Sequence, residues 1–126
     1  MTKEDIITIS QVFWSVPDLK FADNILHLGL KIKKTKSRGP NFNTYILPNK
    51  TEIIAFVEDK HDFKIYDSCI RLSVSKSSIL SANKIFKEFK YDCHLTESPK
   101  YNITTLSCFA PSPHKNCEII ISNFKG

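Results

Sequence analysis

The residues best suited to binding or catalysis lie in two segments, residues 11–16 and 69–74. In each segment they occupy alternate positions and so share one face. These faces carry Gln11, Phe13, Ser15, Cys69, Arg71 and Ser73. If both segments are strands, the residues of each group point to the same side, because successive side chains of a strand point to opposite sides. The guanidinium of Arg71 offers a planar fork of donors that matches a carboxylate or a phosphate, and it keeps its charge near neutral pH.

The cysteines and histidines form no motif of the kind that holds a metal ion or a disulfide framework. No CxxC pair occurs among Cys69, Cys93, Cys108 and Cys117. A chain of this size is stable without covalent cross-links, so we interpret the four as free thiols. The histidines are spread along the chain, at His27, His61, His94 and His114. We expect them to be surface or capping residues rather than ligands.

Positive charge is concentrated in one segment of the chain. Its residues are Lys31, Lys33, Lys34, Lys36 and Arg38. Such a run can attract the phosphates of a nucleic acid. We favour the alternative of a solvated edge strand whose lysines discourage pairing with other sheets, because no aromatic residues are interleaved for base stacking. Nucleic acid is therefore not an expected partner.

Size and composition are typical of a single soluble domain. The chain has 126 residues, of which 41% are hydrophobic and 25% charged, and a net charge of +5. No apolar run approaches the length of about 20 residues that a membrane span needs. The first residues, MTKEDIITIS, lack the basic and apolar regions of a signal peptide. We expect one cytoplasmic domain over residues 1–126, with no membrane partner.

A strand followed by a helix opens the chain. Residues 6–16 alternate, Pro17 cannot donate to a sheet, and Asp18 is a good N-cap, so the strand ends there and a helix begins. Apolar residues recur at helical spacing as far as Gly29, which ends the helix. Trp14 lies on the face toward this helix and is expected in the core. Three more strands are expected at 30–36, 42–47 and 51–57.

The same order of elements returns after a charged linker at residues 58–67. Strand 69–74 precedes an amphipathic helix from about Ile79 to Phe89. Three further strands are expected at 93–97, 103–109 and 117–122. Each half is therefore strand, helix and three strands, a repeat of about sixty residues. We predict an α+β fold of two tandem βαβββ units, at about 6–57 and 68–122.

This duplicated pattern resembles the vicinal oxygen chelate superfamily, which includes glyoxalase I, extradiol dioxygenases, fosfomycin-modifying enzymes and bleomycin-binding resistance proteins. The resemblance is carried by QVFWSVPDL at 11–19, HLGLKI at 27–32, TEIIAF at 51–56, CIRLSV at 69–74 and CEIII at 117–121. It implies that each unit curls its mixed sheet into half of a cup, with the helices on the outer face. Two halves then enclose a small-molecule ligand, and in chains of this size the cup is commonly completed by a homodimer.

The resemblance also implies which residues lie in the cup. Ligand-binding positions fall on Gln11, Phe13, Ser15, Phe56, Arg71 and Ser73. The metal ligands of the family's metal-dependent members fall on Gln11, Glu52, Cys69 and Glu118. In such members Glu118 or Glu52 would shuttle a proton. The four metal positions together form a poor donor set for one ion, because oxygen ligands suit magnesium, manganese or iron whereas a thiolate suits zinc.

For several of these residues a structural role is an alternative to a functional one. Gln11 and Glu52 form either part of a metal site or a hydrogen-bonded polar pair. Arg71 binds a ligand, pairs with a carboxylate of Glu52 or Glu118, or does both. We interpret Cys69 as a small buried apolar residue rather than as a ligand or nucleophile.

Two main functions follow, from different classes. The first is a small-molecule-binding protein of the glyoxalase/bleomycin-resistance type, with no metal or other cofactor and with an anionic or neutral aromatic ligand. The absence of histidines from the four ligand positions favours it. The alternative is a divalent-metal-dependent lyase or isomerase of the glyoxalase I type. A nucleic-acid or partner-binding module that uses the lysine-rich segment is a third and weaker hypothesis.

Overall fold

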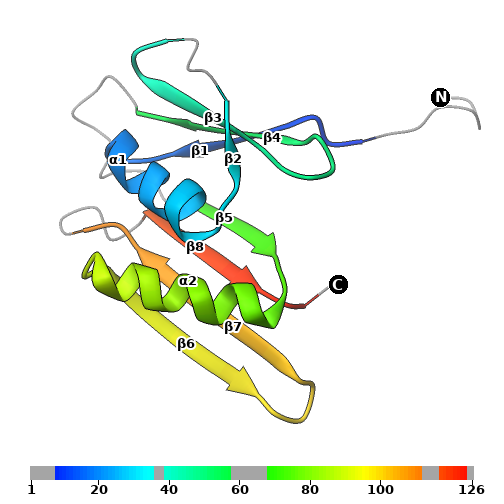
Figure 1. Ribbon diagram of the computed structural model, residues 1–126. Coiled ribbons are helices and arrows are strands. Elements are labelled where there is room, and N and C mark those ends of the chain that lie inside the picture. Colours follow the sequence, from blue (N-terminus) through cyan, green and yellow to red (C-terminus); the bar gives the residue numbers. More distant parts are fainter. Residues whose placement is uncertain (1–7, 36–38, 58–67, 112–116, 125–126) are drawn as a thin grey trace, which may run out of the picture.

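Two four-stranded mixed sheets, each with a helix on one face, make up the protein in a computed structural model (Figure 1). The structure describes residues 8–35, 39–57, 68–111 and 117–124. The first sheet has the order β1-β4-β3-β2, and its strands are β1 (Gln11–Ser15), β2 (Lys33–Lys34), β3 (Phe42–Ile46) and β4 (Glu52–Phe56). The second sheet has the order β5-β8-β7-β6, and its strands are β5 (Ser68–Ser73), β6 (Asp92–Ser98), β7 (Ile103–Phe109) and β8 (Cys117–Ser122).

Both sheets have the same internal pairing. The first strand of each unit is parallel to the fourth, β1 to β4 and β5 to β8, and the remaining neighbours are antiparallel. The predicted α+β fold of βαβββ units is therefore confirmed, and the two sheets do not close into a barrel. From β3 onward the predicted strands agree with the structure to within one residue at each end. Outside the described residues lie Lys36, Arg38, His61, His114 and the predicted linker 58–67.

Each helix begins at a side-chain cap. The Asp18 carboxylate accepts a hydrogen bond of 2.8 Å from the Phe21 amide, and α1 (Leu19–Ala22) follows. This helix continues without a break into a π-helical segment, η1 (Asp23–Gly29). Ser75 caps α2 (Lys76–Glu88) by accepting from the amide of Ser78 at 3.2 Å. Within the described part of the chain, no helix has the length and apolarity needed to cross a membrane.

The second predicted strand is much shorter than expected. The alternation of residues 30–36 predicts a full strand, but only Lys33–Lys34 pair with β3, at the edge of the sheet. The amides of Leu30 and Ile32 donate back to carbonyl groups of the preceding helix, at 3.0 and 2.9 Å. Lys31 between them has a φ of 60°. Because residues 30–32 remain hydrogen-bonded to the helix, pairing with β3 begins only at Lys33.

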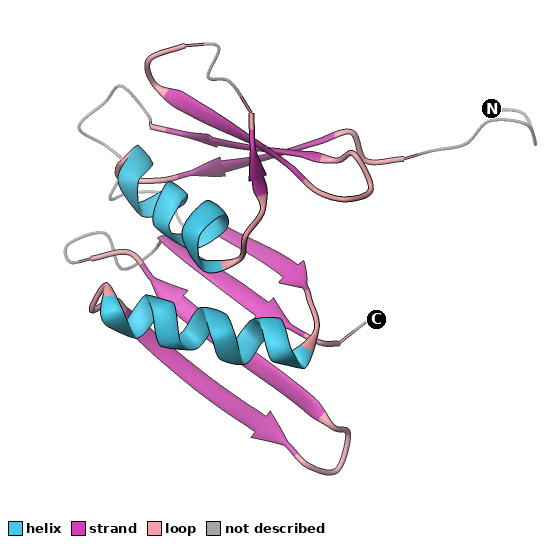
Figure 2. Cartoon of the chain, viewed as in Figure 1, coloured by secondary structure: helices cyan, strands magenta, loops and turns pink. Residues whose placement is uncertain are grey.

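The helices lie on the same side of the two sheets (Figure 2). Beneath the first helix, Trp14 and Val16 are buried, and the indole ring of Trp14 lies 5.8 Å from the ring of Phe21. Beneath α2, the buried side chains include Ile119 and Ile121 of β8. The predicted orientation of the opening strand and the core position of Trp14 are confirmed. One apolar core runs through both units.

The units meet along β1 and β5 and again between their helices. The Ser15 carbonyl accepts a hydrogen bond of 2.7 Å from the Ser68 hydroxyl and one of 3.4 Å from the Cys117 thiol. Burial raises the pKa of Cys117 to about 12, so this thiol keeps its proton and remains a donor at neutral pH. Gly29 packs directly against the ring of Phe86, where no side chain would fit. The first sheet is thereby fixed against the second.

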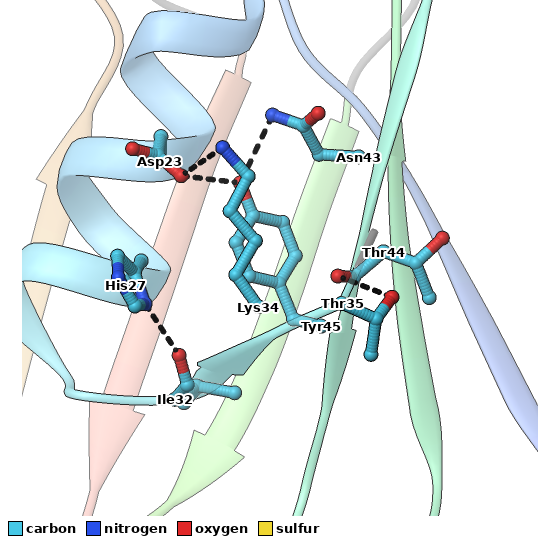
Figure 3. Close-up of polar contacts among 8 residues, drawn as sticks. All are labelled: Asp23, His27, Ile32, Lys34, Thr35, Asn43, Thr44 and Tyr45. Atoms are coloured by element: carbon cyan, nitrogen blue, oxygen red, sulfur yellow. Dashed lines mark hydrogen bonds and ion pairs between the residues drawn. The ribbon is translucent and has the colours of Figure 1, made fainter. Parts of the chain in front are cut away.

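A buried tyrosine connects the first sheet to its helix (Figure 3). The Tyr45 hydroxyl donates to Asp23 Oδ1 at 3.3 Å and accepts from Asn43 Nδ2 at 3.4 Å. Lys34 Nζ lies 3.0 Å from the same carboxylate oxygen. Burial, as the largest cause, raises the pKa of Tyr45 well above its ordinary value. Lys34 therefore belongs to an ion pair with the helix, although the sequence pattern predicts a solvated residue.

We expect Tyr45→Phe to lower the free energy of unfolding by about 1 kcal/mol near neutral pH, because Asn43 and Asp23 each lose a buried partner. The difference from the wild type should narrow above pH 10. The neutral hydroxyl is favoured in the folded state, so its contribution is complete below the unfolded pKa of 10.0 and declines as the pH rises above it. Urea unfolding at several pH values measures this, with the exposed Tyr101→Phe as control. A difference that stays constant up to pH 11 would contradict the assignment.

Candidate ligand-binding site

The open face of the first sheet carries a groove lined by aromatic side chains. Its volume is about 480 Å³, and we call it the aromatic groove. Its described lining residues are Gln11, Phe13, Phe42, Thr44, Glu52, Ile54 and Phe56. They come from β1, β3 and β4 and lie on the face opposite the helix, because their neighbours Trp14, Tyr45 and Ile53 are buried beneath it. The register sets Gln11 beside Glu52 and Phe13 beside Ile54.

The aromatic groove has a polar end and an aromatic end. At the polar end, Gln11 Nε2 donates a hydrogen bond of 3.1 Å to Glu52 Oε1. Toward the other end the rings of Phe13 and Phe56 lie 6.4 Å apart in an edge-to-face arrangement. Phe13 is 63% exposed, which is unusual for a phenylalanine. The arrangement can hold an aromatic molecule against the rings while the amide and the carboxylate bond its polar group.

The open face of the second sheet carries the other predicted site residues. Cys69 lies opposite Glu118 in the register of β5 and β8, and both point away from the buried side chains of Cys117 and Ile119. Glu118 is half-buried on this open face. Its carboxylate interacts with the Cys69 thiol and raises the pKa of that thiol. The predicted base therefore lies on the open face of the second sheet and not in the aromatic groove.

Arg71 and Ser73 line a second cavity, between the two units. This cavity has a volume of about 690 Å³ and is bordered by residues 30–33, 46–50 and 71–74; we call it the junction cavity. The Ser73 hydroxyl donates to the Phe124 carbonyl at 2.8 Å. No ion pair joins Arg71 to a carboxylate of the described residues. Within one chain, Arg71 is thus separated from the aromatic groove to which Gln11 and Phe13 belong.

The structure brings three of the six predicted ligand-binding residues together. Gln11, Phe13 and Phe56 line the aromatic groove, whereas Arg71 and Ser73 line the junction cavity. Ser15 lies between the units, where its carbonyl accepts the bonds from Ser68 and Cys117. The sequence interpretation missed two lining residues of the groove, Phe42 and Thr44. The alternation of β3 could have indicated them, but the buried face of that strand carries Asn43 and Tyr45 and does not look like a core pattern.

Cys69 is exposed, so its interpretation as a buried apolar residue is wrong. It lies at the edge strand of the second sheet, and the helix covers the opposite face. Partial desolvation, and then the charge of Glu118, raise the pKa of its thiol, while Arg71 opposes this with a smaller effect. A thiol with a raised pKa carries little thiolate at neutral pH and is a poor nucleophile.

Two of the histidines are described, and both are on the surface. Nδ1 of His27 lies 3.0 Å from the Ile32 carbonyl beyond the end of η1. Nε2 of His94 lies 3.1 Å from Asp92 Oδ1, and both side chains are more than half exposed. Neither histidine lines the aromatic groove or the junction cavity. Their predicted positions as surface or capping residues are confirmed.

Solved structures of low sequence identity have the same arrangement of elements over almost the whole chain. A glyoxylase/bleomycin resistance protein/dioxygenase domain from Frankia sp. EAN1pec is 16% identical with a TM-score of 0.68, covering 94% of this chain and 98% of that one. The fosfomycin resistance protein FosX from Mesorhizobium loti is 11% identical with a TM-score of 0.67, covering 96% and 95%. The chain has the vicinal oxygen chelate fold.

Other proteins with this fold extend the comparison. Lactoylglutathione lyase from Agrobacterium tumefaciens is 8% identical with a TM-score of 0.65, and the match covers 94% of each chain. No family model and no curated protein sequence matches the chain. The predicted resemblance to the superfamily is therefore confirmed in the structure. At these identities it establishes the vicinal oxygen chelate fold and not an activity.

The residues at the metal positions of the vicinal oxygen chelate fold do not fit one metal ion within this chain. They form two pairs on different sheets, Gln11 with Glu52 and Cys69 with Glu118. In the first pair the amide nitrogen of Gln11 donates to one oxygen of the Glu52 carboxylate, so Gln11 presents a donor and not a ligand atom to this carboxylate. Among the described residues no three His, Cys, Asp or Glu side chains are grouped as a metal site would require. Within one chain, these four residues therefore do not come together as a single set of ligands.

We expect Cys69 to react slowly with iodoacetamide for so exposed a thiol, and Glu118→Gln to increase its rate severalfold. Removing the carboxylate charge lowers the thiol pKa and so increases the thiolate fraction. Peptide mapping by mass spectrometry resolves Cys69 from the other cysteines. Glu97→Gln, which removes an exposed carboxylate from β6, is the matched control and should leave the rate unchanged. A rate for Cys69 equal in wild type and Glu118→Gln would contradict the coupling.

Proposed function

We propose that the protein binds a small aromatic molecule in the aromatic groove and that it does so without a metal ion, in the manner of a glyoxalase/bleomycin-resistance-type binding protein. The observation that carries the proposal is the edge-to-face pair of Phe13 and Phe56 beside the hydrogen-bonded pair of Gln11 and Glu52. A mostly apolar concave surface with a few convergent polar groups is the usual form of a small-molecule site.

The charges of the aromatic groove favour a neutral ligand over an anionic one. Glu52 is the charged residue among its described lining side chains, which include no Lys, Arg or His to bind a carboxylate or phosphate. Arg71, the residue best suited to an anion, lines the junction cavity instead. An aromatic molecule with a hydroxyl or amine donor can bond Glu52 while its ring packs on Phe13 and Phe56. An anionic aromatic compound is the alternative that a binding experiment distinguishes.

We further propose that the protein forms a homodimer through the open face of its first sheet. The ring of Phe13 is 63% exposed on this face and adds to an apolar surface that a second copy can bury. A second copy placed over this face would cover Phe13 and would enclose the aromatic groove. The vicinal oxygen chelate fold, in which two half-cups enclose a ligand, supports this arrangement.

The function is tested by titrating the protein with 1-naphthol, a neutral aromatic probe, and with 1-naphthoate, its anionic analogue. We expect saturable binding of 1-naphthol by isothermal titration calorimetry, with the anion weaker. Phe13→Ala and Phe56→Ala should each weaken 1-naphthol by about fivefold, as expected for the loss of one aromatic contact. Tyr101→Ala removes a ring as exposed as that of Phe13, in the turn between β6 and β7, and should have no effect. Equal weakening by all three substitutions would contradict a site in the groove.

Isothermal titration calorimetry also distinguishes metal-free binding from the metal-dependent alternative. Purified protein is titrated with nickel, zinc and manganese in turn, alone and with 1-naphthol present. Stoichiometric metal binding that is lost in Glu52→Ala would overturn the metal-free proposal and favour a lyase or isomerase. If the metals and a chelator leave the binding of 1-naphthol unchanged, this result supports the metal-free proposal.

Sedimentation velocity over a wide range of protein concentration tests the homodimer. We expect a dimer for the wild type and a monomer for Phe13→Asp, because a buried, unpaired carboxylate in the contact would cost several kcal/mol. Tyr101→Asp places the same charge on an exposed ring outside the proposed contact and should remain dimeric. A wild type that is monomeric at every concentration would contradict the dimer.

A further inference from the structure

The junction cavity is larger than the aromatic groove and is built from different elements. It is bordered by the connection from η1 to β2, by the turn between β3 and β4, and by the end of β5 with the residues after it. The first two segments belong to the first unit and the third to the second unit. The contacts between the units, from Ser68 to Ser15 and from Phe86 to Gly29, hold these segments in place.

Positive charge dominates the lining of the junction cavity. Its charged residues are Lys31, Lys33, Lys50 and Arg71, and no Asp or Glu is found among the described lining residues. Lys31 Nζ is engaged by the Leu28 carbonyl at 2.8 Å. No carboxylate of the described residues pairs with Lys33, Lys50 or Arg71, whereas Lys34 and Lys76 elsewhere both have acidic partners. The cavity thus concentrates cations whose charge the described protein does not neutralise.

The rest of the lining is apolar and continuous with the core. Six aliphatic side chains border the cavity, each of them half-buried: Leu30, Ile32, Ile46, Leu47, Leu72 and Val74. All but Ile46 pack against buried core residues. An apolar ligand placed on them would remove this surface from water without any rearrangement of the core. Cations at the border and an aliphatic floor together define an amphipathic site.

Two of the cavity's lysines occupy strained backbone positions. Lys31 has a φ of 60° and Lys50 a φ of 75°, in the left-handed region that favours glycine. Lys31 follows the end of η1, where glycine is the common residue. Glycine at either position would relieve the strain but would remove a charge from the cavity. Lys90, with a φ of 63° after the end of α2, has the same backbone geometry and does not line the cavity, so it provides a matched control.

We propose that the junction cavity binds a small organic anion with an aliphatic body and a carboxylate or phosphate head. Arg71 offers the head a planar pair of donors and Lys50 a point charge, while the aliphatic side chains cover the body. The volume of about 690 Å³ lies within the usual range for sites of this kind. This site is separate from the aromatic groove and does not depend on the function proposed for it.

The experiment titrates the full-length protein with octanoate and octyl phosphate, with octanol as a probe that lacks the charge and inorganic phosphate as one that lacks the body. We expect saturable binding of both anions, weakened by added salt, and much weaker binding of the other two probes. Arg71→Gln and Lys50→Gly should each weaken octanoate by about tenfold, as expected for losing a charge-assisted hydrogen bond.

Lys90→Gly is the control for Lys50→Gly, because both substitutions remove a lysine and relieve a left-handed backbone. It should leave octanoate binding unchanged. Phe13→Ala should also leave it unchanged, and Lys50→Gly should not affect 1-naphthol, so failure of either site is seen independently of the other. Equal octanoate affinity in wild type, Arg71→Gln and Lys50→Gly would overturn the proposal. So would attachment to phosphatidylglycerol vesicles without saturable binding of octanoate, since the lysines would then act as a membrane-binding surface.

Discussion

A helix covers only one face of each four-stranded sheet, and the rest of the structure depends on this asymmetry. On the covered faces, alternate residues such as Trp14 and Ile119 enter a common core. The residues between them lie on faces that no described helix or strand of the chain covers. The exposed ring of Phe13 is therefore a consequence of the architecture and not an isolated anomaly. The apolar area that remains on the open faces is what a ligand or a second copy can bury.

Alternation in the sequence was sufficient to predict these faces where the buried residues are large and apolar. It placed Trp14 and Val16 toward the helix, and it located the strands from β3 onward closely. It failed where burial is polar, as in β3, where buried Asn43 donates a hydrogen bond to the buried hydroxyl of Tyr45 and Tyr45 donates to Asp23. Hydrophobic pattern carries no signal for such a strand, and so Phe42 was missed as a lining residue.

At the candidate site, the sequence interpretation was wrong for a different reason. The sequence suggested that Gln11 and Arg71 share one pocket because both lie on the open face of a first strand. Within the chain, they belong to different sheets, and the junction between the units gives Arg71 a cavity of its own. No local pattern predicts how two sheets are placed relative to one another. The same repetition explains the two polar pairs, since Gln11 with Glu52 and Cys69 with Glu118 occupy equivalent positions in the parallel pairing of their units.

The packing of Gly29 on Phe86 also affects how this duplicated chain folds. A tandem repeat can in principle unfold one half at a time, as arrays of independent modules do. Here the ring of Phe86, which belongs to α2, fills the space beside Gly29 of the first helix. The buried side chains of the two halves form one core. Loss of either half would expose apolar surface on the other. The shared core therefore leads us to expect that the two halves unfold together in one cooperative transition.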